Sequence, residues 1–290
     1  MDVALAVDIG GTKLAVARVT SDGEVLDRAS APTTGRDGEA LWTALAAVVG
    51  AVRRGDEAVC GVGCGGPMEP GGTAVSPLNI VQWRDFPLRG RLSALLGPGV
   101  PVAVDNDAKA LALGEGWRGA ARGVSDFVAM VVSTGVGGGI VLDGRLLDGA
   151  AGNAGHIGHV IVEPGPDGRL CGCGAHGCLE AEASGTAIRA ITGGPPAEAP
   201  PELRERTGRL VGRAVASVAN LLDLRLAVVA GSVALGFGEP FFAAAQAELD
   251  ARARLSFSQG ARIVPAGLGA DGPLVGAAAV GWRALGNLAR

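Results

Sequence analysis

The chain has 290 residues, of which 48% are hydrophobic, and a formal net charge of −4 at pH 7. This length and apolar content are sufficient for a large core and are more typical of two lobes than of one compact domain. The negative charge and the absence of a lysine- and arginine-rich block argue against a nucleic-acid binder. No uncharged apolar run reaches eighteen residues, and no basic segment precedes the first apolar run, so we expect neither a membrane span nor a signal peptide.

The first part of the chain is predicted to alternate short strands with helices. Apolar runs bounded by turn residues predict strands at 3–8, 14–19, 24–29, 58–63 and 101–104. Apolar residues at helical spacing predict helices at 38–53 and 107–117. Asn106 or Asp107 is the natural N-cap of the second helix.

The second part repeats this pattern. Strands are predicted at 126–132, 140–142 and 226–230, with a glycine-rich turn at 133–139, and helices at 203–222, 239–254 and 272–289. The strand, glycine-rich turn and strand near residue 10 thus recur about 125 residues later, which predicts two related lobes facing each other. Strands that alternate with helices indicate an α/β fold.

Both glycine-rich turns are candidate phosphate-binding segments, because glycine lets backbone N–H groups approach a phosphate closely. In the first, Asp8 would bind Mg²⁺ directly or through a water, and Thr12 and Lys13 would face phosphate. The predicted phosphate-binding residues of the two turns are Asp8, Gly10, Gly11, Thr12 and Lys13, and Thr134, Gly135 and Gly137. The alternative is two ordinary hairpin turns.

Asn106-Asp107 lies where a predicted strand leads into a helix, which is where α/β proteins present polar groups to ligands. A carboxylate at such a place can accept the proton of a hydroxyl that attacks phosphorus. Asp107 is therefore the candidate general base. The alternative is a helix cap with no further role.

One imidazole and three thiols within twenty residues form a complete tetrahedral zinc shell: His159, Cys171, Cys173 and Cys178. A shell without an open position predicts a structural zinc, which would order the neighbouring His156 and Glu180. His176 is a competing ligand, and incidental thiols in a glycine-rich loop are the alternative. The odd count of five cysteines, clustered rather than spread, favours a reducing cytoplasm.

Several separate motifs together resemble the ROK family of sugar kinases, over nearly the whole chain. They are DIGGTK at 8–13, GVGCGGP at 61–67, VDNDAKALALGE at 104–115, STGVGGG at 133–139, GHIGHV at 155–160, CGCGAHGCLEAEASG at 171–185 and VVAGSV at 228–233. The resemblance implies an actin-like, ribonuclease-H-like ATPase fold with two lobes and a cleft. The expected domains are a small lobe of residues 1–106 plus 275–290 and a large lobe of residues 107–274 with the zinc loop.

The resemblance also implies a phosphotransfer from MgATP to the 6-hydroxyl of a sugar, with Asp107 as the base. It implies a sugar site made of Gly66, Asn79, Asn106, Asp107, His156, His159 and Glu180, and an adenosine-side motif with Gly231 and Ser232. The implied cofactors are ATP, Mg²⁺ and a structural Zn²⁺. The implied assembly is a homodimer or homotetramer, with no nucleic-acid or membrane partner.

Two positions depart from the family pattern. Gly65 stands where proline is usual, which should loosen the sugar-side turn. His156 replaces the glutamate of the family's glucokinases, and the run AGHIGH at 154–159 resembles the family's N-acetylmannosamine kinases. An imidazole donates one hydrogen bond and accepts one, whereas a carboxylate only accepts. N-acetylmannosamine is therefore favoured over glucose, with N-acetylglucosamine or another hexose as further alternatives.

A second class of function is a non-enzymatic sugar sensor. The family's transcriptional repressors carry a helix-turn-helix segment before the first phosphate motif, and Asp8 is expected to lie too early in the chain for one. A sensor without activity is expected to have lost Asp107 or the glycine-rich turns, and both are present. The phosphoryl donor stays open between ATP and polyphosphate.

Overall fold

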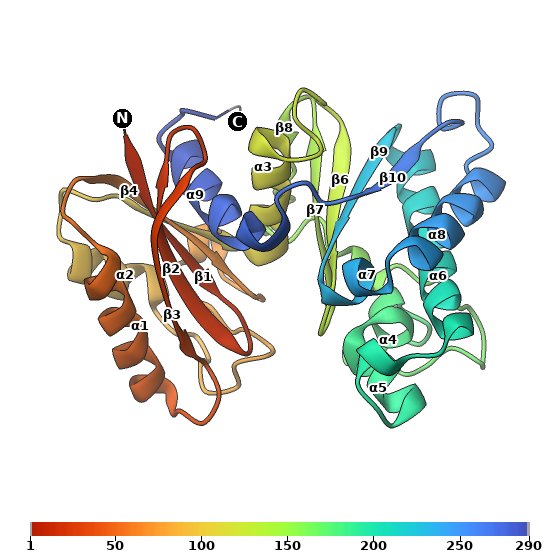
Figure 1. The fold of residues 1–290 in the computed structure, drawn as a ribbon, viewed down its shortest axis with the longest axis horizontal. Helices are drawn as coiled ribbons and strands as arrows, with labels where there is room; N and C mark the ends of the chain where they lie inside the picture. Colours follow the sequence, from red (N-terminus) through yellow and green to blue (C-terminus); the bar gives the residue numbers. More distant parts are fainter. Residues whose placement is uncertain (1, 289–290) are drawn as a thin grey trace. The chain divides into compact units, whose positions relative to one another are not determined.

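The computed structural model describes residues 2–288 and divides the chain into two compact units (Figure 1). The first unit contains Met1–Arg122, Asp148–Ala154 and Leu268–Arg290, and the second contains Gly123–Leu147 and Gly155–Gly267. Helix α3 (Asp107–Arg118) belongs to the first unit, beyond the boundary expected at residue 106. The expected division into a lobe of residues 1–106 plus 275–290 and a lobe of residues 107–274 stays a prediction.

The first unit is built on one mixed five-stranded sheet with the order β3-β2-β1-β4-β5. Its strands are β1 (Val3–Ile9), β2 (Lys13–Thr20), β3 (Val25–Pro32), β4 (Glu57–Cys64) and β5 (Val102–Asn106). Strands β1, β2 and β3 form an antiparallel meander, and β4 and β5 run parallel to β1. The carboxyl ends of β1, β4 and β5 therefore lie at one edge of the sheet.

The two faces of this sheet carry side chains of different size, because successive residues of a strand point to opposite faces. Leu5 and Val7 pack with helices α1 (Gly38–Val52) and α2 (Leu88–Leu96). Ala4 and Ala6 pack on the other face with helix α9 (Gly272–Ala284) (Figure 1). The small face lets α9 approach so closely that a Cβ on Gly61 of β4 would overlap the carbonyl oxygen of Ala277.

The second unit contains a sheet with the order β10-β9-β6-β7-β8. Its strands are β6 (Phe127–Val132), β7 (Val136–Leu142), β8 (Arg145–Leu146), β9 (Leu226–Ala230) and β10 (Arg262–Pro265). Strands β6, β7 and β8 form an antiparallel meander, and β9 and β10 run parallel to β6 and β9, respectively. This is the topology of the first sheet repeated strand for strand, so the predicted α/β duplication is confirmed.

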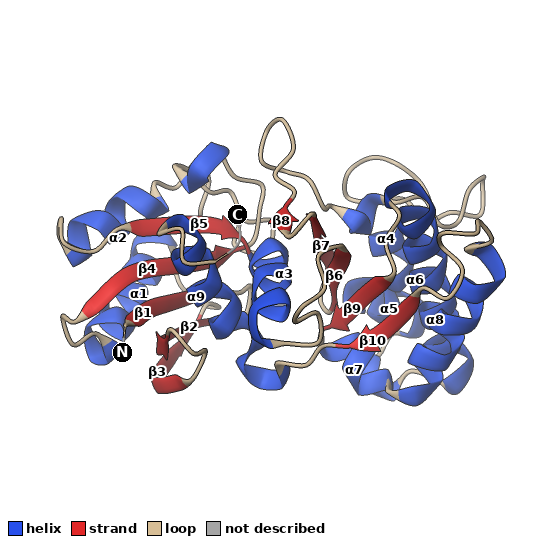
Figure 2. Ribbon diagram, turned by 90° about the horizontal axis from the view of Figure 1, so that it is seen from above, coloured by secondary structure: helices blue, strands red, loops and turns tan. Residues whose placement is uncertain are grey.

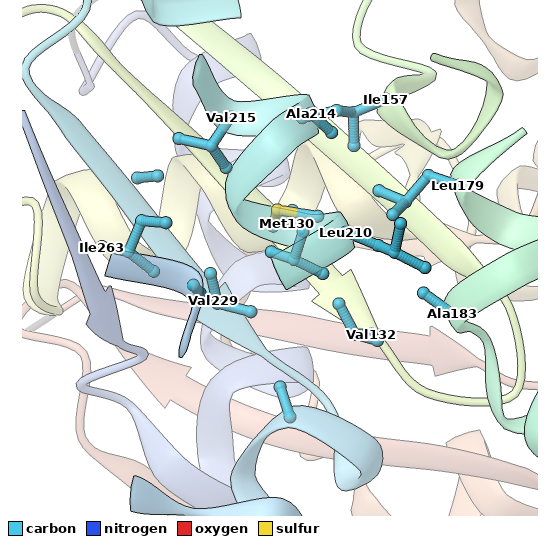
Figure 3. Close-up of a cluster of buried hydrophobic side chains, with 14 of the residues drawn as sticks. Met130, Val132, Ile157, Leu179, Ala183, Leu210, Ala214, Val215, Val229 and Ile263 are labelled. Atoms are coloured by element: carbon cyan, nitrogen blue, oxygen red, sulfur yellow. The ribbon is translucent and has the colours of Figure 1, made fainter. Parts of the chain in front are cut away.

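Helices pack against this second sheet (Figure 2) and contribute buried residues to its main hydrophobic cluster. They are α4 (Leu179–Ala183), α5 (Gly185–Thr192), α6 (Pro201–Leu222), α7 (Ser232–Phe237) and α8 (Glu239–Arg252). Met130 and Val132 of β6 lie in one buried cluster with Leu179 of α4 and Leu210 of α6 (Figure 3). The core thus anchors α4 and α6 to the strand that leads into the second glycine-rich turn.

The chain also forms single turns of 3-10 helix, η1 (Pro70–Gly72), η2 (Ile157–His159), η3 (Pro196–Glu198) and η4 (Gly269–Asp271). Two predicted segments differ most from the structure. The second glycine-rich turn is shorter than 133–139, because β7 already begins at Val136. The last helix ends at Ala284 instead of residue 289, and residue 289 lies outside the described residues. Among residues 2–288, none of the helices combines the length and apolar character needed to cross a lipid bilayer.

Candidate functional site

The first glycine-rich turn lies at the carboxyl end of β1. The N–H of Gly10 donates to the carbonyl of Lys13 at 3.0 Å, and the hydroxyl of Thr33 donates to the carbonyl of Gly10 at 2.8 Å. A Cβ on Gly11 would stand 2.7 Å from the Cβ of Asn79, closer than carbon atoms approach. Glycine at position 11 therefore lets Asn79, a predicted sugar ligand, lie against the predicted phosphate turn.

Three parallel strands bring the other predicted residues of this unit to the same edge. Ile9 of β1 pairs with Cys64 of β4, and Cys64 pairs with Asn106 of β5. The segment after each strand carries predicted site residues: the first turn after β1, Gly66 after β4 and Asp107 after β5. This is the edge at which open α/β sheets bind ligands.

Asn106 and Asp107 form the start of helix α3. The Oδ1 atom of Asn106 accepts from the N–H groups of Ala108 at 3.0 Å and Lys109 at 3.4 Å, which confirms the predicted N-cap. Its Nδ2 atom would lie 3.5 Å from a Cβ on Gly66, so the amide donor faces the segment after β4. The carboxylate of Asp107 is exposed at the N-terminus of the helix, where the helix dipole favours negative charge.

Asp8 and Asp107 are close enough to affect each other. Desolvation, and then the negative charge of Asp107, raise the pKa of Asp8 to about 7, while the charge of Lys13 lowers it. Burial, with the charges of Asp107 and Asp8, also raises the pKa of the Cys64 thiol between them. Two carboxylates that repel each other near a phosphate-type turn are the donor set that a hard divalent cation such as Mg²⁺ prefers.

In the second unit, the second glycine-rich turn connects β6 to β7. The N–H of Ser133 donates to the carbonyl of Gly135 at 2.9 Å, and the hydroxyls of Ser133 and Ser232 are hydrogen-bonded at 3.0 Å. Because β9 runs parallel to β6, Ser232 after β9 lies at the same sheet edge as the turn. The predicted second phosphate motif and the predicted adenosine-side motif are therefore in contact.

Gly137, predicted as a phosphate-turn residue, lies inside strand β7 and pairs with Val131. The glycines of β7 allow another segment to pack closely. A Cβ on Gly138 would lie 2.8 Å from the Cγ2 of Ile157 in η2. Part of the glycine-rich motif thus positions the segment that carries the predicted sugar ligands His156 and His159.

The predicted zinc ligands come together in the structure. The ligand atoms of His159, Cys171, Cys173 and Cys178 all lie within 4.8 Å of one another. The sulfur atoms of Cys173 and Cys178 are 3.7 Å apart, and the sulfur of Cys171 is 3.7 Å from Nδ1 of His159. Zn–S bonds of about 2.3 Å and tetrahedral angles give sulfur–sulfur separations of about 3.8 Å. The donor set and its spacing fit a tetrahedral zinc.

The two remaining histidines have different surroundings. Nδ1 of His176 donates to the carbonyl of Gly168 at 2.9 Å, and His176 is not a member of the ligand cluster, so it is not the competing ligand considered from the sequence. His156 is exposed, and its ring lies nearly parallel to that of His159, with centroids 6.0 Å apart. The predicted specificity residue therefore lies beside a predicted metal ligand.

Glu180 lies on α4, two residues after Cys178. Its Oε2 atom accepts from the N–H of Val136 at 2.9 Å, so this predicted sugar ligand is bonded to the end of the second glycine-rich turn.

Two further residues beside these motifs were not identified from the sequence. Thr186 donates its hydroxyl to the carbonyl of Thr134 at 2.9 Å, and Lys109 donates to Asp148 at 2.7 Å. The only sequence signal for Thr186 was the Ser-Gly-Thr helix start after the zinc motif, and Lys109 resembled an ordinary surface lysine of a helix.

Comparison with known proteins gives a consistent result. The model of the ROK family matches residues 4–283. An N-acetylmannosamine kinase from Escherichia fergusonii is 38% identical over 250 residues, covering 81% of this chain and 84% of that protein.

Two solved structures cover nearly the whole chain. A ROK family glucokinase from Streptomyces griseus, in complex with glucose and AMPPNP, has 30% identity and a TM-score of 0.83, covering 97% of this chain and 99% of that one. A ROK hexokinase from Thermus thermophilus has 32% identity and a TM-score of 0.80, covering 98% of this chain and 99% of that one. The predicted two-lobed, actin-like fold is thereby confirmed. The chain belongs to the ROK family.

Proposed function

We propose that this chain is a sugar kinase that transfers the γ-phosphoryl group of ATP to the 6-hydroxyl of a hexose or N-acetylhexosamine. The observation that carries the proposal is the exposed carboxylate of Asp107 at the start of α3, beside Asp8 and at the same sheet edge as the first glycine-rich turn. Family membership and the glucokinase bound to glucose and AMPPNP support the reaction class and the nucleotide donor.

In the proposed mechanism, Asp107 accepts the proton of the sugar hydroxyl as its oxygen attacks the γ-phosphorus in line. Asn106 orients the sugar through its free amide donor, because Oδ1 is occupied by the helix cap. Asn79 and Gly66 line the same edge. Backbone amides of the two turns, together with Thr12, Lys13 and Thr134, hold the phosphates. Bound Mg²⁺ would neutralise phosphate charge, and Asp8 would hold it directly or through a water.

We propose N-acetylmannosamine as the favoured substrate. The support is His156, which stands where the family's glucokinases carry glutamate, and the 38% identity to N-acetylmannosamine kinases. His159 and Glu180 are the proposed sugar ligands next to it. The zinc bound by His159 and the three cysteines would be structural, because four protein ligands leave no position for a reacting group.

The deciding experiment measures ADP release by the purified protein with MgATP and compares kcat/KM for N-acetylmannosamine, glucose and N-acetylglucosamine. A clear preference for N-acetylmannosamine supports the full proposal. A preference for glucose keeps the kinase and overturns the substrate. No turnover with any sugar, with ATP or polyphosphate as donor, favours a non-catalytic sensor.

A substitution at Asp107 tests the base. Asn at this position keeps the Oδ1 acceptor that bonds the N–H of Ala108 at 2.9 Å, so the helix start is retained. We expect Asp107→Asn to lower kcat by at least about 100-fold, because it removes proton transfer in the transition state. Sugar affinity, measured by calorimetry, is expected to stay within about twofold. Undiminished turnover would remove Asp107 from the mechanism.

The assembly and location are also proposals. Family resemblance implies a homodimer or homotetramer of the 28.7 kDa chain, which sedimentation equilibrium resolves. The proposed location is the cytoplasm, because the three clustered thiols must stay reduced to bind a metal.

A further inference from the structure

The second glycine-rich turn is held on one side by the segment that contains α4 and α5. The N–H of Gly185 donates to the carbonyl of Ser133 at 2.7 Å, and the N–H and hydroxyl of Thr186 both donate to the carbonyl of Thr134, at 3.2 and 2.9 Å. Glu180 accepts from the N–H of Val136 at 2.9 Å. Three consecutive bonds at the start of α5 and one from α4 thus fix both sides of the turn. We call this set of contacts the α4–α5 clamp.

The fit between the clamp and the turn is tight. A Cβ on Gly135 would stand 2.8 Å from Oε2 of Glu180, which leaves room for glycine alone unless the carboxylate moves. The carboxylate and the turn therefore cannot shift independently. A change in the position of Glu180 must be accompanied by a change at Val136 or Gly135.

The clamp rests on rigid support. Leu179 and Ala183 of α4 are fully buried in the cluster that also contains Val132, the last residue of β6 (Figure 3). The N–H of Leu179 donates to the carbonyl of Val160, next to the metal ligand His159. The helix that carries Glu180 is thus fixed to the core and to the proposed zinc site.

On its other side, the turn contacts the proposed adenosine-side motif through the bond between the hydroxyls of Ser133 and Ser232. A turn that donates backbone amides to phosphate must hold them in a fixed direction, because a misplaced donor loses most of its hydrogen-bond energy. The clamp supplies that constraint without contacting the phosphate.

We propose that Glu180 and Thr186 are positioning residues for the second phosphate turn, and that Glu180 thereby couples sugar binding to nucleotide binding. The proposal rests on the proposed function. A carboxylate has two oxygens and about four acceptor positions, so Glu180 can hold the N–H of Val136 and accept a sugar hydroxyl together. A bound sugar then orders the carboxylate that orders the turn, and the linkage is reciprocal.

Thr186 provides the first test, because it is exposed and has no proposed ligand. Thr186→Val removes the hydroxyl donor at almost constant shape, and Thr186→Ser keeps it as the matched control. We expect Thr186→Val to weaken binding of Mg·AMPPNP by about 3–10-fold, the loss of one hydrogen bond. Its KM for MgATP should rise with little change in the Kd for sugar, and Thr186→Ser should behave as wild type.

Glu180 provides the second test, carried out without sugar so that a sugar contact contributes nothing. Glu180→Ala removes the acceptor and is expected to weaken Mg·AMPPNP binding by a similar factor. Glu180→Gln keeps a side-chain oxygen for the N–H of Val136, so it should lower sugar affinity while retaining most nucleotide affinity. In wild type, sugar should tighten Mg·AMPPNP binding, and Glu180→Ala should abolish that effect.

The possible outcomes distinguish failure of the clamp from failure of the proposed function. Wild-type protein that binds Mg·AMPPNP, with all four variants binding it equally well, would overturn the clamp and leave the proposed kinase intact. Wild-type protein that binds no nucleotide would overturn the proposed function and the clamp with it. If Thr186→Val weakened sugar binding as much as nucleotide binding and also lowered the melting temperature, the damage would be general, and this too would overturn the clamp.

Discussion

Asn106 uses the two ends of one amide for different purposes. Its oxygen caps α3 and its nitrogen faces Gly66 at the sheet edge, so one side chain stabilises the helix start and presents a donor beside Asp107. The sequence predicted the cap because asparagine before an Ala- and Leu-rich helix is the preferred N-cap. It could not predict the donor direction, which depends on pairing of β4 with β5.

His156 is the residue at which the sugar preference is most directly testable. It is exposed, and its ring lies beside that of His159. We expect His156→Glu to raise the ratio of kcat/KM for glucose to that for N-acetylmannosamine by about tenfold. The reason is that a carboxylate can only accept hydrogen bonds from a sugar, whereas an imidazole can also donate one. His156→Gln, which keeps one donor and one acceptor, is the control. A ratio unchanged in His156→Glu would mean that His156 does not set specificity.

Asp8 should make the Mg²⁺-free protein less stable as the pH rises. Its pKa is about 7 in the folded state and about 4 in the unfolded state, so the folded state binds the proton more tightly. The resulting stabilisation is complete below pH 4 and is lost as the pH rises through 7.

Asp8→Asn removes this dependence. We expect the variant to gain free energy of unfolding relative to wild type between pH 4 and pH 8, by about 2–4 kcal/mol. Urea unfolding at several pH values, without added Mg²⁺, measures the difference. Parallel pH profiles for the two proteins would contradict a shifted pKa at Asp8.

The elements that the sequence predicted well are those whose pattern is long or strongly apolar. Strand β9 was predicted with its observed bounds, and α1, α3 and α6 within two residues. Helices α2, α4, α5 and α7 and strand β10 were not predicted. Each is short, and short segments owe their structure to tertiary packing more than to local preference.

Strand β7 shows a second limit of sequence patterns. Its glycines favoured a turn, since glycine usually weakens a strand. The structure uses them for the close approach of η2, a contact between segments about twenty residues apart. In contrast, all four residues of the His/Cys cluster could be predicted from the sequence, because they lie close together along the chain.

The stability of the loop that carries Cys171, Cys173 and Cys178 should depend on the proposed zinc ion. We expect Cys173→Ser to reduce bound zinc well below one equivalent and to lower Tm by about 5–10 °C, because the proposed zinc site loses one of its four ligands. Elemental analysis and calorimetry measure both effects. His176→Gln, in the same loop but outside the cluster, should retain its zinc. Full zinc content and an unchanged Tm in Cys173→Ser would refute a structural zinc.

At the scale of the whole molecule, the chain crosses between the two units four times. At two of these crossings, residues of α3 bind the first residue of the segment that returns to the first unit. Lys109 is 3% exposed and contacts Asp105 at 3.2 Å and Asp148 at 2.7 Å, where the chain re-enters this unit. Glu115 is fully buried and accepts from the N–H of Leu268, at the last passage. The helix that begins with the proposed base therefore also anchors the connections.

Lys109→Met tests this anchor. Methionine fills the same space without charge and leaves Asp105, whose pKa is already raised by desolvation, without its nearest cation. We expect a loss of about 2–4 kcal/mol in the free energy of unfolding. The loss should be larger at pH 8 than at pH 5, because protonation of Asp105 relieves it. Adding Asp105→Asn should restore part of the stability, and an additive double mutant would argue against the pairing.

The packing of α9 against the small face of the first sheet has a consequence for synthesis on the ribosome. Strands β1 and β2 emerge early, whereas the helix that covers their alanine face starts at Gly272, 150 residues after Arg122. At a synthesis rate of about 5–20 residues per second, that face stays uncovered for about 8–30 s before α9 is made. During this interval the nascent first unit exposes the apolar alanine face of its sheet, and transiently exposed apolar surface of this kind makes a folding chain prone to aggregation.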